Sequence, residues 1–514
     1  MSDFKINFVS GNIAAIRSCV IQKLLELCSY KTFTYKNSQD LINFMMVNKE
    51  IHKILFPILI TRIEYALYKV KYRHRKTNFD KIERMYVDTH ILQSGMFTEF
   101  KKLKEIRFHD VFNQAIGFDE WPQTLTKITF GYWFNQKLYV RSLPTRLTYL
   151  CFGYNYNQPI EERSLPNTLT HLTFGWEFNQ KIKKGILPQS LTHLTFGCRF
   201  NQFLPGDVLP NNLLYLEFGY EFDCYFEKNT LPQSLQEINF DGGKFNRYLD
   251  PKVLPVSLKK MSFSVCFNQP LVLGVFLENL TELDLGMAFN HSLEIGILPI
   301  TLSRLIFSRC FNQKLISGVL PNNLKYLEFG HDFSQSLVDD NNHSILPNTL
   351  THLIFGKMFN GSLTDQHGCN ILPNTLTHIE FHFDSIFNQT LLNFEGRSIL
   401  PKSLTHLEFG NTFNQPICDL NDNTIFPNTL VHLKFGRHFN QPLTSNLCNS
   451  TSMLPNGLIS LELGGSFDQP LIDKIIPTSV TKLIMYKIPE QPLGKRLEQI
   501  IIKKIYLTES PESI

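Results

Sequence analysis

The stretch that decides the fold is LPNTLTHLTFGWEFNQKI, residues 165–182. Its segment LTHLTF alternates apolar with polar residues and is rich in Thr and Phe, a pattern typical of a short, half-buried strand. Gly175 follows this segment, where the backbone needs either a positive φ or a close approach that a Cβ atom would block. Pro188 in the next copy lacks an N–H, so it marks the connection before the next strand.

Copies of this unit fill most of the 514-residue chain. FNQ or a close relative begins at sixteen positions, first every 22 or 23 residues and later every 26 to 28. Such a short strand cannot bury its apolar face alone, so successive units are expected to stack into a solenoid with one parallel sheet of about 17 rungs. The extra residues of the later units fall mainly in one segment, which predicts longer loops along one edge.

Two columns of the repeat predict what holds the rungs together. Of the 44 Phe residues, fourteen occupy the sixth strand position and fifteen begin the FN motif, with Tyr156 as the exception in the second column. These rings are expected to form two buried, stacked aromatic spines. Thirteen of the sixteen FN sites keep Asn, and buried Asn side chains could bond the backbone of the bend in rung after rung.

Composition and charge exclude several classes of protein. With 43% hydrophobic and 19% charged residues, the chain has enough apolar material for a packed core. The ten Cys residues form no CxxC pair and no zinc-like grouping, which favours reduced thiols. There is no clean signal peptide and no apolar run of about 18 residues, so a cytoplasmic protein without a membrane segment is expected.

The positive charge is concentrated near the N-terminus. Residues 1–100 contain 15 Lys+Arg and 9 Asp+Glu, and the densest cluster lies within residues 69–76. Such a cluster can contact phosphates or an acidic partner, but a solvated face is more common, so nucleic-acid binding is not expected. The chain has no GxGxxG after a strand, no GxxxxGK[ST], no HExxH and no GxSxG. We therefore expect no enzyme, no catalytic or metal residues and no cofactor.

The segments FNQPL, LPNTLTHL and LPQSLTHL resemble the FNIP repeat family over about residues 100–488. This family is a relative of the leucine-rich repeats and occurs in amoebae and in the giant DNA viruses that infect them. The pattern L-x-x-L-x-F-x-x-x-F-N is similar to a leucine-rich repeat with one residue added. The resemblance implies an α+β, leucine-rich-repeat-like β-solenoid that serves as a protein-interaction array and has no catalytic role.

Residues 1–99 are expected to form a separate, small all-α module, with helices at Ile21–Tyr30, from Ser38 through Leu55, and at Ile58–Tyr68. The stretch DLINFMMVNKEIHKILFPIL, residues 40–59, resembles the F-box, although an unrelated helical cap is the alternative. The resemblance implies that this module docks on a Skp-type adaptor of a cullin-type ubiquitin ligase. It assigns the following residues to the bundle core or to the adaptor face: Leu24, Leu25, Leu41, Val47 and Ile51. Residues 489–514 lack the repeat pattern and are expected to cap the solenoid.

The exposed face of the sheet is the expected target site. Because side chains alternate along a strand, the third and fifth strand positions should face outward. The selected third-position residues are Tyr149, His171, His193, Tyr215, Arg304, Tyr326, His352, His378, His406 and His432. This mixed surface favours protein recognition over a phosphate track.

Two questions stay open from the sequence. The last four His, with Glu380 and Glu408 beside them, could bind a divalent metal or charge below about pH 6.5, but simple repetition of the THL consensus is favoured. For function, the leading hypothesis is a substrate-recruiting adaptor of a cullin-type ubiquitin ligase. The alternative is a stand-alone scaffold that binds host or viral proteins without a link to ubiquitin.

Overall fold

The computed structural model describes residues 63–64, 82–87, 97, 100–117, 121–240, 242–445, 451–487 and 495–503. Within these ranges it contains twenty strands and one short helix, α5 (Lys495–Ile500). The strands are β1 (Ile63–Glu64), β2 (Arg84–Val87), β3 (Glu105–Phe108), β4 (Lys127–Thr129), β5 (Tyr149–Cys151), β6 (His171–Thr173), β7 (His193–Thr195), β8 (Tyr215–Glu217), β9 (Glu237–Asn239), β10 (Lys260–Ser262), β11 (Glu282–Asp284), β12 (Arg304–Ile306), β13 (Tyr326–Glu328), β14 (His352–Phe355), β15 (His378–Phe381), β16 (His406–Glu408), β17 (His432–Lys434), β18 (Ser460–Leu463), β19 (Lys482–Met485) and β20 (Ile501–Lys503).

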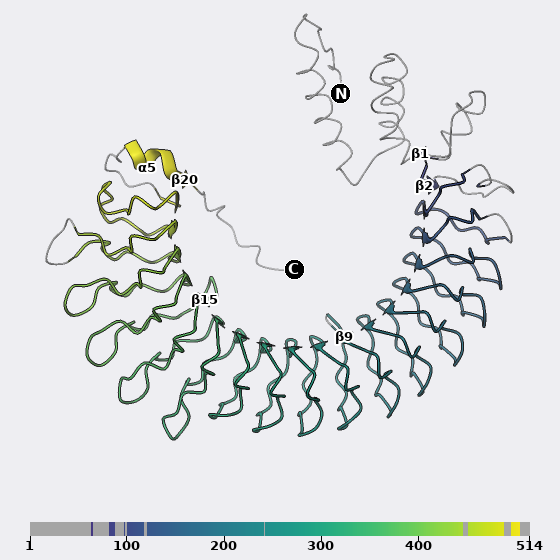
Figure 1. Cartoon of the computed structure of the whole chain (residues 1–514), viewed down its shortest axis with the longest axis horizontal. Coiled ribbons are helices and arrows are strands. Elements are labelled where there is room, and N and C mark those ends of the chain that lie inside the picture. The colour runs from purple at the N-terminus through teal and green to yellow at the C-terminus, as the bar shows by residue number, and fades with distance from the viewer. Residues whose placement is uncertain are drawn as a thin grey trace, which may run out of the picture.

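All these strands belong to one parallel sheet in which each strand pairs with the next along the chain. Equivalent residues lie opposite each other, as Leu172 and Leu194 do. The units curve into an open arc whose inner, concave side is the sheet and whose outer side carries the connections (Figure 1). The predicted parallel solenoid is therefore confirmed, and the insertions of the later units lie in the outer loops, where short antiparallel bridges such as Val338 with Ser344 close them.

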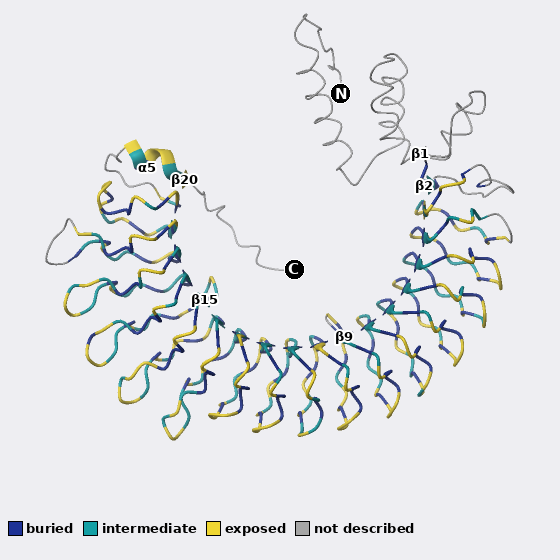
Figure 2. Ribbon diagram, in the orientation of Figure 1, coloured by how far each residue is buried: buried dark blue, intermediate teal, exposed yellow. Residues whose placement is uncertain are grey.

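The core lies behind the sheet and consists largely of the two predicted aromatic spines. Phe174 at the sixth strand position stacks on Phe178 of the FN motif within one rung, with ring centroids 3.8 Å apart. Between rungs, Phe174 lies 5.8 Å from Phe196, and Phe178 lies 6.1 Å from Phe200. All 29 Phe residues of the two columns are buried, and the buried core runs the length of the arc (Figure 2). Both spines are confirmed.

Glycine recurs directly after the strand in most units, as at Gly153, Gly175 and Gly197, and this glycine column exists because adjacent rungs approach very closely there. A Cβ atom on Gly175 would lie only 1.7 Å from the carbonyl oxygen of Gly153, and one on Gly197 would lie 1.7 Å from that of Gly175. Neither residue has a positive φ. Of the two reasons predicted for this column, close backbone approach is the one that applies to these rungs, and any larger residue would force them apart.

The predicted Asn ladder is present, but its predicted burial is wrong. The Oδ1 atom of Asn157 accepts hydrogen bonds from the backbone N–H of Asn179, at 2.9 Å, and from Nε2 of Gln180, at 3.0 Å. The same pattern links other rungs, for example Asn113 to Asn135. Asn179 is nevertheless exposed. Each Asn follows a buried aromatic residue, Phe or, before Asn157, Tyr156, so the side chain of the Asn points away from the core and the ladder runs along the surface.

The N-terminal prediction is tested only at its edges. Residues 1–62, which contain the first two expected helices, lie outside the described residues. A continuous helix at Ile58–Tyr68 is wrong, because β1 lies within it and pairs with β2. Since β2 pairs with β3, the sheet begins before residue 100.

At the other end, the described part of the predicted cap extends the sheet. β20 pairs with β19, and Leu497 of α5 is fully buried. Arg496 donates hydrogen bonds to backbone carbonyls of the last repeat, including that of Ile476 at 3.0 Å. These contacts satisfy carbonyl groups that would otherwise lack a following rung.

Tyr156 provides a direct test of the second spine. It replaces Phe in that column, is fully buried, and its hydroxyl has no hydrogen-bond partner in the described part of the chain. A buried hydroxyl without a partner is destabilising. Tyr156→Phe should therefore raise the free energy of unfolding by about 1 kcal/mol, measured by denaturant titration.

The matched control is Tyr215→Phe. The hydroxyl of Tyr215 donates to Oε2 of Glu217 at 2.9 Å, so its removal should give no gain in stability. An equal gain in both variants, or none in Tyr156→Phe, would contradict the packing described for Tyr156.

Candidate functional site

The third strand position forms a continuous column on the concave face, here called the concave column. Each of its members is followed by a buried residue and then by another outward residue, as in His171, Leu172 and Thr173. The ten predicted face residues all lie in this column, on β5–β8 and β12–β17, and all are half-buried. The alternation of residues in the sequence thus correctly placed these side chains on the exposed, concave face of the sheet.

The structure divides the predicted residues into two stacks. In the first, the ammonium of Lys127 lies 4.4 Å from the ring centre of Tyr149. Tyr149 stacks on His171 at 6.0 Å, and His171 on His193 at 4.2 Å. Tyr215 completes this stack, 5.8 Å from His193.

The second stack is longer. The guanidinium of Arg304 lies 3.6 Å from the ring centre of Tyr326, a cation–π contact. Tyr326 stacks on His352 at 6.0 Å. From there the imidazoles continue at 4.1, 4.1 and 4.4 Å through His378, His406 and His432. Charged residues on β9–β11 separate the two stacks, and one pair among them, Lys260 and Glu282, forms a salt bridge of 2.9 Å.

The residues that orient these imidazoles were not identified from the sequence. The Thr before each of several His places its hydroxyl 2.9 Å from Nδ1, as Thr351 does for His352 and Thr377 for His378. The same hydroxyl of Thr351 bonds to the backbone carbonyl of Lys325 in the preceding rung, also at 2.9 Å. The recurrent Thr-His dipeptide is visible in the sequence. That the Thr orients the His cannot be inferred from it, because the contact depends on how the rungs stack.

The fifth strand position adds carboxylates beside the column. The hydroxyl of Tyr326 donates to Oε2 of Glu328 at 2.7 Å. Burial and this carboxylate raise the pKa of Tyr326 to about 12. Lys434 forms a salt bridge of 2.9 Å with Glu408. Glu380, in contrast, has no hydrogen bond or ion pair within the described residues, and burial followed by repulsion from Glu408 raises its pKa.

Three histidines of the second stack, His352, His378 and His406, are hard to protonate. Burial, followed by the neighbouring His352, His406 and His432, lowers the pKa of His378 to about 4. Burial also lowers the pKa values of His352 and His406. Charging of these three residues just below pH 6.5, the less favoured of the two interpretations of the ladder, is therefore not supported. Among the described residues, no group of three or more His, Cys, Asp or Glu side chains is arranged to hold a metal ion.

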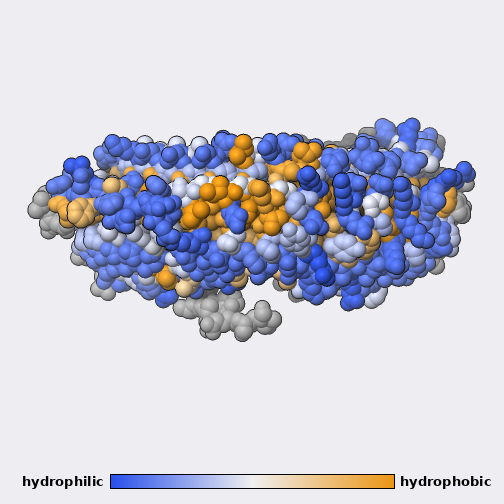
Figure 3. Space-filling model, turned by 90° about the horizontal axis from the view of Figure 1, so that it is seen from below, coloured by the Kyte–Doolittle hydropathy of each residue, from blue (hydrophilic) through white to orange (hydrophobic). Residues whose placement is uncertain are grey.

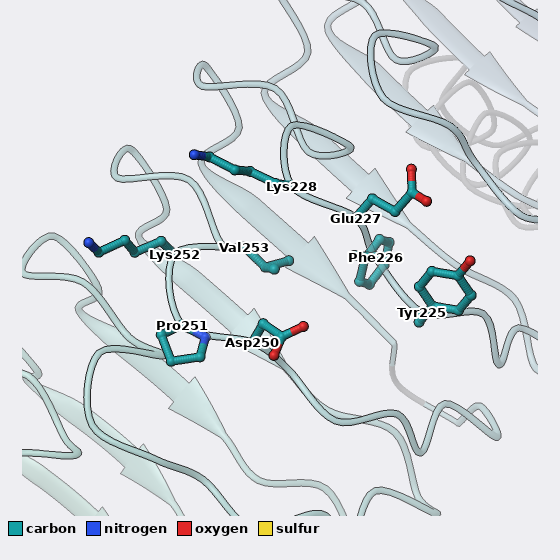
Figure 4. A pocket seen from close by; sticks show the side chains of 8 residues that line it. All are labelled: Tyr225, Phe226, Glu227, Lys228, Asp250, Pro251, Lys252 and Val253. Atoms are coloured by element: carbon teal, nitrogen blue, oxygen red, sulfur yellow. The ribbon is translucent and has the colours of Figure 1, made fainter.

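The convex surface offers two other features. Exposed apolar side chains gather near its middle (Figure 3), and residues such as Leu273 and Ile295 are 70% and 61% exposed. A shallow depression of about 340 Å³ lies in the loops after β8 and β9. In it the ends of Lys228 and Lys252 lie on the side away from Tyr225 (Figure 4), so its polar groups do not converge on one point.

Other predicted binding residues cannot be placed. The F-box-like set, Leu24, Leu25, Leu41, Val47 and Ile51, lies outside the described residues, as does the basic cluster within residues 69–76. In the parts of the chain that are described, no helix has the length and apolar character needed to cross a membrane.

Comparison with protein families decides the assignment of the repeats. The FNIP Repeat family matches residues 134–177, 178–221, 222–266, 267–310, 311–358, 342–384, 387–421 and 451–487, which is more than half of the chain. The chain belongs to the FNIP repeat family. The resemblance seen in FNQPL and LPNTLTHL is therefore confirmed. A comparison with curated proteins gives no match.

Among solved structures, one similar at 37% identity agrees with this assignment. CroV588, described as a novel circular LRR protein, is 37% identical with a TM-score of 0.66, and the match covers 80% of this FNIP repeat chain and 64% of CroV588. This chain thus spans less than two thirds of CroV588. Toll in the Toll–Spatzle complex of Drosophila, at 15% identity and a TM-score of 0.51 over 84% of this chain and 61% of that one, shares the fold alone. YopM from Yersinia enterocolitica is 19% identical with a TM-score of 0.45, and the match covers 80% of this chain and 87% of YopM.

The low pKa of His378 predicts a pH dependence of stability. An unfolded His has a pKa of about 6.5, so between that value and about 4 the unfolded chain binds more protons than the folded one. The free energy of unfolding should therefore fall as the pH falls from about 6.5 towards 5. His378→Gln should reduce this fall, measured as the thermal unfolding midpoint at pH 7, 6 and 5.

The pH range and a control variant make this measurement specific for His378. The raised pKa of Glu380 acts in the opposite sense, adding stability as the pH falls through its own titration, so the comparison stays above pH 5. His367, which is exposed on an outer loop, supplies the control His367→Gln, which should keep the wild-type dependence. Identical pH profiles for His378→Gln and wild type would contradict the burial effect.

Proposed function

We propose that the FNIP repeat array is a non-enzymatic protein-binding scaffold whose concave column holds the target. The observation that carries this proposal is that the two stacks of the concave column present half-exposed Tyr, His and Arg side chains, while the main contacts between rungs lie at other positions of the repeat. The rungs are held by backbone pairing, by the buried Phe spines and by the Asn and Thr ladders.

The composition of the concave column supports protein recognition. Tyr and Arg are enriched in protein interfaces because they offer large, rigid contact areas with a polar end. Here Tyr149 and Tyr326 each lie under a cation, so both rings are already oriented before any partner arrives. Leucine-rich-repeat folds generally bind protein partners, which agrees with this use of the surface.

The link to ubiquitin is a finer part of the proposal. It rests on the resemblance of residues 40–59 to the F-box, and it would make residues 1–99 the docking module for a Skp-type adaptor. The array would then present its target, a host or viral protein, to a cullin-type ligase. The alternative, a stand-alone scaffold, keeps the same concave target site and omits the ligase.

The target site can be tested by capture with surface variants. The full chain is immobilised, captured proteins are identified by mass spectrometry, and their affinities are measured with purified components. Tyr149→Ala combined with Tyr215→Ala should weaken binding of a true target at least tenfold, about 1.4 kcal/mol or more. Leu273→Ala combined with Ile295→Ala on the convex face should leave it unchanged.

The same capture separates the two forms of the proposal. A Skp-type adaptor that binds the full chain and is lost with Val47→Asp and Ile51→Asp supports the ligase link. If a purified Skp-type adaptor does not bind the full chain in direct assays, the ligase link is contradicted and the stand-alone scaffold is supported. Targets that depend on the convex pair and not on the concave pair would contradict the proposed face.

A further inference from the structure

The hydrogen bonds around the second stack fix the tautomer of its imidazoles. A Thr hydroxyl has one proton, and those of Thr351, Thr377 and Thr405 donate it to a backbone carbonyl of the preceding rung, at 2.9, 3.1 and 3.0 Å. The same oxygens lie 2.8 to 2.9 Å from Nδ1 of the following His. Both contacts are favourable only if Nδ1 carries the hydrogen and donates it to the hydroxyl.

The opposite nitrogen of each ring is then a lone-pair acceptor. Nε2 of His352, His378 and His406 has no hydrogen-bond partner within the described residues. The three rings stack at 4.1 Å with interplanar angles of 11° to 12°, so their lone pairs form a regular row. Since the three rings resist protonation, these atoms stay acceptors at neutral pH.

Carboxylates extend this acceptor row. Glu380 lies two residues after His378 on β15 and therefore on the same face. It is half-buried and makes no hydrogen bond or ion pair within the described residues, although the ammonium of Lys434 on β17 attracts it from farther away. Around it, β14 presents His352 and the apolar Ile354, and β16 presents His406 and Glu408.

Cations stand only at the margins of this patch. Arg304 on β12 is engaged with Tyr326, and Lys434 on β17 is engaged with Glu408. Glu328 on β13 is a further acceptor, already bonded to the hydroxyl of Tyr326. The centre of the second stack thus offers hydrogen-bond acceptors and a negative charge, with no donor directed at them from within the described residues.

We propose that His352, His378, His406 and Glu380 form an acceptor-only patch that binds an arginine-rich segment of a protein partner. This inference rests on the proposed protein-binding function and specifies the chemistry of the partner. A guanidinium is the matching ligand because it has five N–H donors and no acceptor. Its charge pairs with Glu380, and its remaining N–H groups reach the row of Nε2 atoms.

Acidic pH should release such a segment. Protonation of the imidazoles converts Nε2 from acceptor to donor and adds positive charge, while protonation of Glu380 removes the negative charge that pairs with arginine. Glu328, Glu408, Lys434 and Arg304 are the other charged groups near the patch. Lys434 attracts the charge of Glu380, whereas Glu408 and Glu328 repel it. Binding and pH sensitivity therefore arise from the same four side chains.

The test uses a fluorescent nona-arginine peptide and the full chain, with nona-glutamate as the opposite probe, and follows anisotropy at constant ionic strength. Nona-arginine should bind at pH 7.5 and at least tenfold more weakly at pH 4, close to the pKa of His378. Glu380→Gln, which keeps the size of the side chain, should weaken binding at pH 7.5 at least tenfold. Glu294→Gln on the exposed outer loop after β11 is the matched control and should bind as wild type does.

Several outcomes would overturn the inference. These are equal affinity in Glu380→Gln and wild type, binding of nona-glutamate as tight as that of nona-arginine, or nona-arginine binding that does not weaken between pH 7.5 and pH 4. Nona-arginine binding that appears only after Arg73→Gln and Arg75→Gln would mean that the chain's own basic segment occupies the patch, and would overturn the assignment to a partner.

This test can fail independently of the proposed function. If captured targets depend on Tyr149 and Tyr215 while Glu380→Gln changes nothing, the concave target site stands and the acceptor patch does not. If no protein is captured through the concave face, yet nona-arginine binding depends on Glu380, the patch exists as a cation site and the scaffold proposal fails.

Discussion

The shape of the molecule depends on a difference in rung spacing across the solenoid. Equivalent imidazoles on the concave face are 4.1 to 4.4 Å apart, and hydrogen bonding holds adjacent strands about 4.8 Å apart. Behind the sheet, equivalent Phe rings are farther apart, 5.8 Å between Phe174 and Phe196 and 6.1 Å between Phe178 and Phe200. Each rung is therefore a wedge with its broad side in the aromatic core, and a stack of such wedges must curve with the sheet inside (Figure 1).

The same wedge shape determines how closely the side chains on the concave face pack, and therefore their charge states. Stacking in the inner column brings the imidazoles into contact and shields them from water, and burial followed by the neighbouring imidazoles lowers the pKa of His378. Glu380 lies on the same face as these rings and has no ion pair of its own within the described residues. The ladders that fix the rungs, such as Asn157 to Asn179 and Thr351 to Lys325, lie at other positions of the repeat. The contacts that hold the rungs together and the proposed binding residues thus occupy separate columns of the repeat. The residues of the concave column can therefore change without loss of the fold.

Much of this architecture could be predicted from the sequence because the repeat multiplies each local signal. Alternation placed the strands and the outward residues, and the regular spacing of Phe placed both spines. Properties that depend on relations between rungs could not be predicted. The direction of curvature, the surface position of Asn179 and the Thr contacts that set the tautomer of His378 all require the distance between stacked units. The strand at Ile63–Glu64, within an expected helix, shows that a short apolar segment is ambiguous where the repeat gives no support.

The measurement that tests the wedge most directly is small-angle X-ray scattering of a variant with a thinner spine. A Leu side chain has a smaller volume than a Phe side chain, so replacing consecutive rings of the FN column in mid-arc should let the rungs move closer together on the outer side and flatten the arc. The residues to replace with Leu are Phe267, Phe289, Phe311, Phe333 and Phe359. The account predicts a larger radius of gyration and a larger maximum dimension than for wild type, with strand content retained by circular dichroism. A folded variant with unchanged dimensions would contradict the claim that the aromatic spines set the curvature.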